Sequence, residues 1–171
     1  MPARYRRPSY PRRRSRSRKA WAYTFGNATT LTVGQLANLD LLAPLAVVGS
    51  GYFGATVLRV ILDMTVLWGT NPITGNPFMG LGLIVGRATD LTGPTANGLN
   101  VLSNPENPWA WIKTVYPKTA PTIDAADVYA FDVRVNRRVR GVSDRFMLNI
   151  SQDAAQSVTV NWSARTLVSL P

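Results

Sequence analysis

The stretch of sequence that decides the fold is Asp127–Val139, which reads DVYAFDVRVNRRV. Apolar and polar residues alternate along it, so side chains of opposite character project to opposite faces of an extended chain. One face carries Tyr129, Phe131, Val133 and Val135. The other face carries Val128, Ala130, Asp132, Arg134 and Asn136. A period of two residues is typical of a β-strand buried on one face, and we expect such a strand here.

Thr56–Gly69 gives the second strong strand signal. The segment is almost continuously apolar, as expected for a strand with both faces covered. Arg59, Asp63 and Thr65 share one face and make that face partly polar. Further strands are expected at Trp21–Val33, Leu81–Ala88, Trp109–Lys113, Phe146–Ser151 and Ser157–Leu170.

Turn residues separate these segments, and a loop rich in Gly, Pro and Asn spans residues 89–108. Leu36–Leu42 predicts a helical turn that ends before Pro44, and Gly26-Asn27 predicts a bulge or a kink. The pattern GSGYFG at residues 49–54 matches a phosphate-loop motif only formally. No clear strand precedes it and no helix follows, so we interpret it as a turn.

This pattern of short strands and uneven loops indicates an all-β sandwich or barrel. A single eight-stranded jelly-roll sandwich fits the length of the chain and its long connections. The 171 residues suffice for one domain. We expect residues 1–20 to form a disordered basic arm and residues 21–171 to form the jelly-roll domain.

The charge of the chain is concentrated at its N-terminus. Nine of its 19 basic residues, and none of its nine acidic residues, lie within residues 1–19. These basic residues are Arg4, Arg6, Arg7, Arg12, Arg13, Arg14, Arg16, Arg18 and Lys19. The arm has too few apolar side chains to offset the entropy of ordering, which predicts disorder. The rest of the chain is almost neutral.

An arginine-rich arm of this kind is suited to a polyanion partner. The guanidinium group matches phosphate oxygens with a fixed fork of donors and stays charged at any working pH. We therefore expect the arm to bind nucleic acid with little sequence specificity. Trp21, beside the arm, is expected to stack on bases, as are Tyr5 and Tyr10. The alternative roles are a nuclear-localisation signal alone or an extension that increases solubility.

A second basic cluster lies in the expected domain. It consists of Arg134, Arg137, Arg138, Arg140 and Arg145, flanked by Asp132 and Asp144. Two interpretations remain open. Arg137, Arg138 and Arg140 continue the phosphate-binding surface of the arm, or the cluster forms ordinary surface ion pairs with the two aspartates. The tryptophans Trp68, Trp109, Trp111 and Trp162 are expected to be core or interface anchors.

The composition argues against an enzyme. The chain has no cysteine and no histidine, which excludes thiolate nucleophiles, histidine bases and metal sites built from either residue. The carboxylates are scattered, so no acid/base pair, metal ligand set or cofactor is expected. No apolar run approaches the ~20 residues of a membrane-spanning helix, and no secretory signal is recognisable. Charged residues make up only 16% of the chain, below the ~25% of ordinary globular proteins, which favours an obligate assembly.

The arm followed by a cysteine-free β domain resembles the single-jelly-roll capsid proteins of small circular Rep-encoding single-stranded DNA viruses (circovirus-like). The segment Phe131–Leu148, which reads FDVRVNRRVRGVSDRFML, is similar to a late segment of such proteins. There, an Asp-x-Arg strand leads to a basic doublet and then to an apolar strand.

The resemblance implies self-assembly into a T=1 icosahedral shell of sixty copies, with the arms directed inward onto a packaged single-stranded genome. DNA is favoured over RNA as that genome. It further implies a place in the virion. The arginine-rich composition of the arm also predicts a nuclear import role in addition to nucleic-acid binding, with a stage in the host nucleus and an import receptor as a further partner. The competing hypothesis is a non-assembling, sequence-unspecific nucleic-acid-binding protein with a basic extension.

Overall fold

The computed structural model describes residues 17–30, 34–45, 54–68, 78–87, 109–118, 126–140, 144–152 and 158–170, with only the backbone at 28–30, 34–37 and 87. Within these ranges the chain forms eight β-strands and one 3-10 turn, η1 (Ala43–Leu45). The strands are β1 (Arg18–Thr30), β2 (Gly34–Asp40), β3 (Thr56–Leu67), β4 (Met79–Arg87), β5 (Trp109–Val115), β6 (Ala126–Arg138), β7 (Asp144–Gln152) and β8 (Val158–Leu170).

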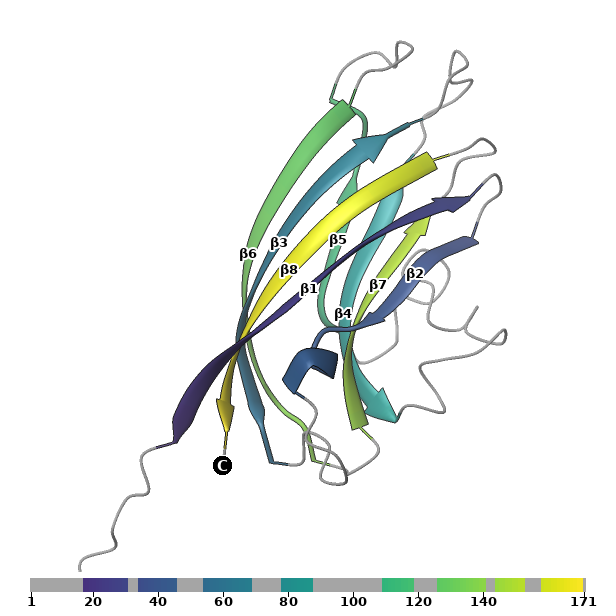
Figure 1. The fold of residues 1–171 in the computed structure, drawn as a ribbon. Helices are drawn as coiled ribbons and strands as arrows, with labels where there is room; N and C mark the ends of the chain where they lie inside the picture. Colours follow the sequence, from purple (N-terminus) through teal and green to yellow (C-terminus); the bar gives the residue numbers. More distant parts are fainter. Residues whose placement is uncertain are drawn as a thin grey trace, which may run out of the picture.

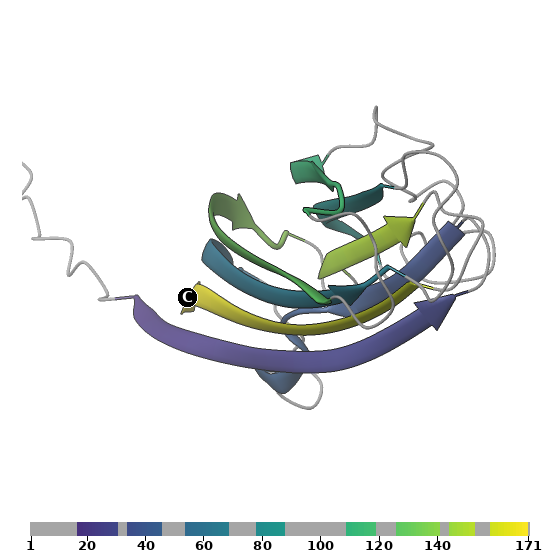
Figure 2. The ribbon, with the colours of Figure 1, turned by 90° about the horizontal axis from the view of Figure 1, so that it is seen from above.

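The strands form two four-stranded sheets that pack face to face (Figures 1 and 2). Sheet A has the order β1-β8-β3-β6 and sheet B the order β2-β7-β4-β5, and every strand pair is antiparallel. Only β4 and β5 are consecutive in the chain and adjacent in a sheet. Every other pair of consecutive strands divides between the two sheets. This alternation between two packed sheets is the jelly-roll arrangement, so the predicted fold class is confirmed.

The core lies between the inner faces of the two sheets, and it follows the period of two that predicted the strands. In β3, Val60, Leu62, Met64 and Val66 are buried, and alternate residues of the neighbouring β8 are buried as well. Sheet B contributes Leu81 and Leu83 of β4 with Phe146, Leu148 and Ile150 of β7. Each fully buried side chain of this size stabilises the fold by about 1.5–3 kcal/mol.

The alternation predicted for Asp127–Val139 is confirmed in β6. Tyr129 and Val133 are buried, whereas Val128, Ala130 and Asp132 on the opposite face are exposed. In β3, however, only one face is fully buried. The outer face of β3, meaning the face turned away from sheet B, carries half-buried side chains such as Ile61, because no described element packs over it.

Near the N-terminus one local prediction was wrong, and one of the two alternatives predicted at a second position is excluded. Leu36–Leu42 is not a helical turn, because residues 34–40 pair with β7 as strand β2, and only the following η1 is helical. Gly26-Asn27 is not a bulge, because the β1–β8 register runs through both residues without a shift. Local propensity was overridden by pairing with a distant strand in both places.

The boundary between arm and domain also differs from the predicted one. The change of composition placed it at Trp21, but β1 begins at Arg18, which pairs with Leu170 of β8. Backbone pairing does not depend on side-chain charge, so basic residues extend an edge strand as long as their side chains reach solvent. Arg18 and Lys19 are both exposed.

A buried carboxylate joins three segments at the far end of β6. Asp127 accepts hydrogen bonds from Nε1 of Trp68 (3.0 Å) and from the backbone N–H of Lys118 (2.8 Å). The phenol oxygen of Tyr129 lies 3.3 Å from the same carboxylate and donates to the carbonyl of Tyr116 at 2.5 Å. Burial, reinforced by the charge of Asp127, raises the pKa of Tyr129 to about 12.

Candidate nucleic-acid interface

A backbone irregularity shapes the end of β6 that carries the basic cluster. Between the pairs Arg59↔Arg134 and Val57↔Arg137, β3 has one residue and β6 has two. The extra residue brings Asn136 into the left-handed region, with φ at 50°. Asparagine is among the few non-glycine residues that tolerate this conformation. Such bulges re-aim the side chains that follow them and are common beside functional sites.

The residues around this bulge line a cavity that spans the two sheets. Its volume is about 360 Å³, and its lining residues are Val85 of β4, Ala110 of β5, and Asn136, Arg137, Arg138 and Arg140. No carboxylate belongs to the described lining. The lining thus combines two apolar residues, one asparagine and three arginines, a composition that suits an anion.

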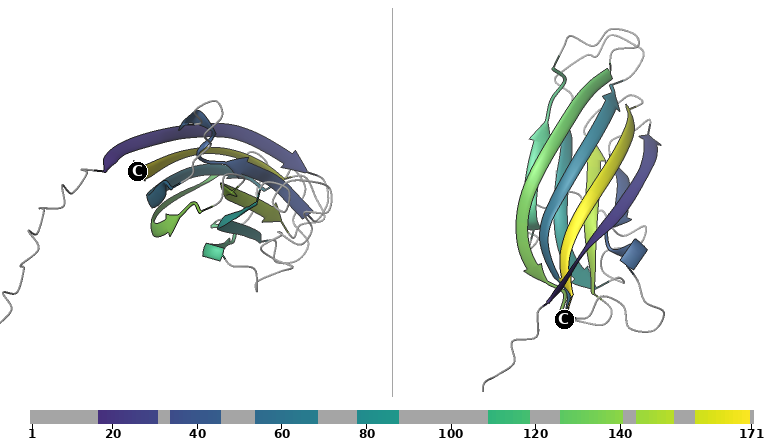
Figure 3. Two further views of the ribbon diagram at one scale, coloured as in Figure 1. Left: turned by 90° about the horizontal axis from the view of Figure 1, so that it is seen from below. Right: turned by 60° about the vertical axis from the view of Figure 1, so that its left-hand side comes forward.

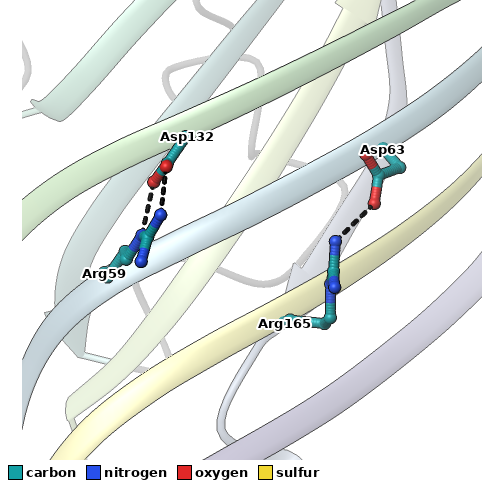
Figure 4. Close-up of polar contacts among 4 residues, drawn as sticks. All are labelled: Arg59, Asp63, Asp132 and Arg165. Carbon is teal, nitrogen blue, oxygen red and sulfur yellow. Dashed lines mark hydrogen bonds and ion pairs between the residues drawn. The ribbon is translucent and has the colours of Figure 1, made fainter.

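The ion pairs on the described residues explain why this cavity keeps its positive charge. Asp132 is held by Arg59 of the neighbouring strand, through the Nε–Oδ1 bond of 2.6 Å and a second, shorter contact (Figure 4). This contact raises the pKa of Arg59 and, together with the charge of Arg134, lowers the pKa of Asp132. Arg145 pairs with Asp40 at 3.5 Å. Among the described residues, no ion pair joins a carboxylate to Arg137, Arg138 or Arg140.

The members of the basic cluster differ in their surroundings. Arg145 forms an ion pair, but its partner is Asp40, whereas the sequence predicted Asp132 or Asp144. Arg137, Arg138 and Arg140 instead surround the cavity. Asp144 accepts a hydrogen bond from the backbone N–H of Arg140 at 3.3 Å.

Strand order brings this cluster to the end of sheet A at which β1 begins. Lys19 pairs with Ser169, Ser169 with Thr56, and Thr56 with Arg138, so these four residues form one row across sheet A. With neighbouring strands about 4.8 Å apart, Lys19 and Arg138 are separated by roughly 14 Å. The start of β1, the C-terminus and the end of β6 meet at this end of the molecule (Figure 3, right).

The predicted arm residues divide between described and undescribed parts of the chain. Arg18 and Lys19 open β1 with exposed side chains, and Trp21 is 39% exposed on the outer face of the same strand. The other arm arginines, Arg4, Arg6, Arg7, Arg12, Arg13, Arg14 and Arg16, lie outside the described residues, as do Tyr5 and Tyr10.

The other tryptophans are anchors, as predicted. Trp68 and Trp162 are buried in the core between the sheets. Trp111 packs on Phe131 with ring centroids 5.5 Å apart, and Trp109 packs against the small cluster of Ile84 and Met147.

Two exposed aromatic residues of β1, Tyr23 and Phe25, were not among the predicted site residues. The alternation of Trp21–Phe25 was visible in the sequence, but alternation alone does not say which face is outward. The cavity contribution of Val85 and Ala110 was also missed, because it depends on how sheet B packs on sheet A.

The described part of the chain meets neither the requirements of a metal-binding cluster nor those of a membrane-spanning helix. It contains no group of three or more Asp, Glu, His or Cys side chains able to hold a metal ion. None of its helices is long and apolar enough to cross a membrane.

No protein-family model matches this sequence, and no curated protein is detectably similar to it. Several solved structures have a similar chain course. The decameric BFDV capsid protein, from a circovirus, is 10% identical over 91% of this chain and 99% of that one, with a TM-score of 0.46. The Triatoma virus empty capsid is 12% identical over 91% and 92%, with a TM-score of 0.45. A cyanophage Pam1 capsid chain is 17% identical over 99% and 94%, with a TM-score of 0.39. All three are structural proteins of viral shells.

Proposed function

We propose that this chain is a viral capsid protein that assembles into a small closed shell and packages single-stranded nucleic acid. The arm and the basic end of sheet A, defined by Arg18, Lys19, Arg137, Arg138 and Arg140, provide the nucleic-acid-binding surface. The resemblance of the sequence to circovirus-like capsid proteins favours a T=1 shell and a DNA genome.

The observation that carries the proposal is the row from Lys19 to Arg138 across sheet A. Two basic segments more than 100 residues apart in the chain meet at one end of the fold. An extension that served only solubility would not require a second basic cluster beside the start of β1, whereas a nucleic-acid-binding surface would. A nucleic-acid strand held by the arm would reach the arginine-lined cavity within roughly 14 Å.

The charge distribution supports many weak arms acting together rather than one strong binding domain. Nine cations that neutralise phosphates of a single strand give a slope of about −6 for log affinity against log salt. Collecting identical arms on one shell raises their effective concentration around a single genome. The nearly neutral remainder of the chain fits a surface that is partly covered by neighbouring copies.

The proposal extends to the route of assembly. An arginine-rich terminus also has the composition of a nuclear import signal, so we propose the host nucleus as the site of assembly and an import receptor as a transient partner. This element is tested separately, by the location of a fluorescent fusion with and without residues 2–17.

Deletion of residues 2–17 tests packaging while leaving β1 complete. Purified full-length protein should form closed particles with an absorbance ratio (260/280 nm) typical of nucleoprotein, and the truncated protein should lose most of that cargo. A matched control replaces every arm arginine by lysine, which keeps the charge and should keep the cargo. The proposal fails if the full-length protein stays small and carries no nucleic acid, or if the truncated protein packages equally well.

A further inference from the structure

The largest side chains of β1 point away from the core. Trp21, Tyr23 and Phe25 are 39%, 61% and 82% exposed on the outer face of sheet A. The residues between them, Ala22 and Thr24, point inward with much smaller side chains, and Ala22 is 1% exposed. We call Trp21, Tyr23 and Phe25 the aromatic row.

This orientation is the reverse of what burial of apolar area favours. Turning the three rings inward would remove much more apolar surface from water than burying Ala22 does. Single exposed apolar residues are common, but a continuous set on one face marks an interaction surface. Fold stability therefore does not account for the row, whereas binding of a ligand would.

The spacing of the row fits flat rings inserted between its members. Alternate residues of a strand are about 6.7 Å apart, which is twice the ~3.4 Å between stacked bases of one nucleic-acid strand. A base can therefore stand between Trp21 and Tyr23, and another between Tyr23 and Phe25. Within the described aromatic residues, no ring contact joins these three side chains. A base pair inside a duplex has no room for such insertion, because its faces are already covered.

The charges around the row fit a phosphate backbone. Lys19 precedes the row on the same face of β1, and the arm with its arginines precedes Lys19. Arg165 of β8 pairs with Tyr23 in the strand register, and one of its nitrogens contacts Asp63 at 3.1 Å (Figure 4). The Arg165 side chain is 46% exposed although it pairs with Asp63, so it remains accessible to a phosphate on the outer face of sheet A.

We propose that the aromatic row binds unpaired bases of a single-stranded nucleic acid by stacking, as a continuation of the arm. This inference rests on the proposed function and adds the form of the ligand to it. The arm alone has no means to tell a single strand from a duplex, because phosphates occur in both. The aromatic row supplies that preference, since stacking on side chains needs bases with free faces.

The rival occupant of the row is a second copy of this chain, packed against the rings as an apolar interface. The two occupants respond differently to leucine. Leucine preserves apolar burial against a protein but removes the flat π-face that a base requires. The double variant Tyr23→Leu/Phe25→Leu therefore separates them, and both positions are exposed enough for the chain to fold normally.

The binding test measures full-length chain and variants with a fluorescent oligothymidylate and with a duplex of equal length. The double leucine variant should bind the single strand about 10-fold or more weakly than the unaltered chain, with duplex affinity unchanged. The double variant Tyr23→Phe/Phe25→Tyr should bind like the unaltered chain. Val128→Ala, an exposed position on the outer face of β6, is the matched control and should have no effect.

Photocrosslinking provides a readout that does not depend on affinity. An oligonucleotide carrying 5-iodouracil should crosslink to Trp21, Tyr23 or Phe25, located by mass spectrometry. Three results would overturn the inference while leaving the proposed function intact. The double leucine variant could lose affinity equally for single strand and duplex, or keep its affinity for the single strand. The crosslinks could also be confined to the arm. Loss of particle assembly in the leucine variant, with unchanged nucleic-acid affinity, would assign the row to a second copy. If the unaltered chain binds neither ligand, both proposals fail.

Discussion

Gly26 of β1 lies directly against the indole ring of Trp162, its register partner on β8. A Cβ atom at Gly26 would stand 2.7 Å from Cζ2 of Trp162, well inside van der Waals contact. The ring fills the space that a side chain on β1 would need, and this packing keeps Trp162 92% shielded from solvent. The glycine thus has a packing role at a strand position where glycine is otherwise unfavourable.

Gly26→Ala should destabilise the fold by about 1–3 kcal/mol, the usual cost of overpacking a core. The ring cannot simply rotate away, because it is buried between the two sheets. Urea denaturation followed by tryptophan fluorescence measures the effect. Asn27→Ala, at the exposed next position, is the control and should change the midpoint little; an equal effect of both variants would contradict the packing account.

Asp127→Ala should be more destabilising than Asp127→Asn. The alanine removes the acceptor of the hydrogen bonds from Nε1 of Trp68 and the backbone N–H of Lys118. Loss of a buried acceptor of this kind costs about 2–4 kcal/mol, whereas asparagine retains one oxygen. Thermal unfolding of the two variants decides the order, and equal melting temperatures would show that the carboxylate does not join these segments.

Alkaline stability should depend on Tyr129. Its pKa is raised in the folded chain to about 12 from the ordinary value of 10, so the folded state favours the neutral phenol. This contribution is complete below pH 10 and is lost as the pH rises from about 10 to about 12. Tyr129→Phe should reduce the fall in the denaturation midpoint over that range. A variant that loses stability as steeply as the unaltered chain would exclude this group as the cause.

Arg137→Gln/Arg138→Gln should weaken nucleic-acid binding about equally for all sequences. Removing two phosphate contacts should reduce the slope of log affinity against log salt by about 1.4 for a single strand. Lys113→Gln, which removes one exposed cation from β5, is the control for a change in net charge alone. Slopes that change no more than in this control would place Arg137 and Arg138 outside the interface.

The strands were predictable because the sequence alternates at the period of a half-buried sheet. Val128 and Tyr129 illustrate this, since their opposite exposure follows directly from their positions. Leu36–Leu42 was not predictable, because its strand conformation comes from hydrogen bonds with β7, more than 100 residues later. The pattern of residues within the segment does not identify a pairing strand so far away in the sequence.

The candidate site was predictable only in parts. The sequence identifies Lys19 and Arg138 as members of basic segments, but their common row requires the strand order β1-β8-β3-β6. Likewise, the aromatic alternation of Trp21 and Tyr23 defines a face without saying whether that face is inward. That choice depends on the small Ala22 and Thr24 side chains fitting against the tightly packed core.

A cryo-electron-microscopy reconstruction of the purified full-length protein tests the central claim most directly. We predict a closed icosahedral particle in which Arg18 and Arg138 face the interior, with nucleic-acid density against that end of sheet A. Protein that remains a monomer or small oligomer in the presence of single-stranded nucleic acid would contradict the account. A closed shell with Arg18 and Arg138 on its outer surface would contradict it equally.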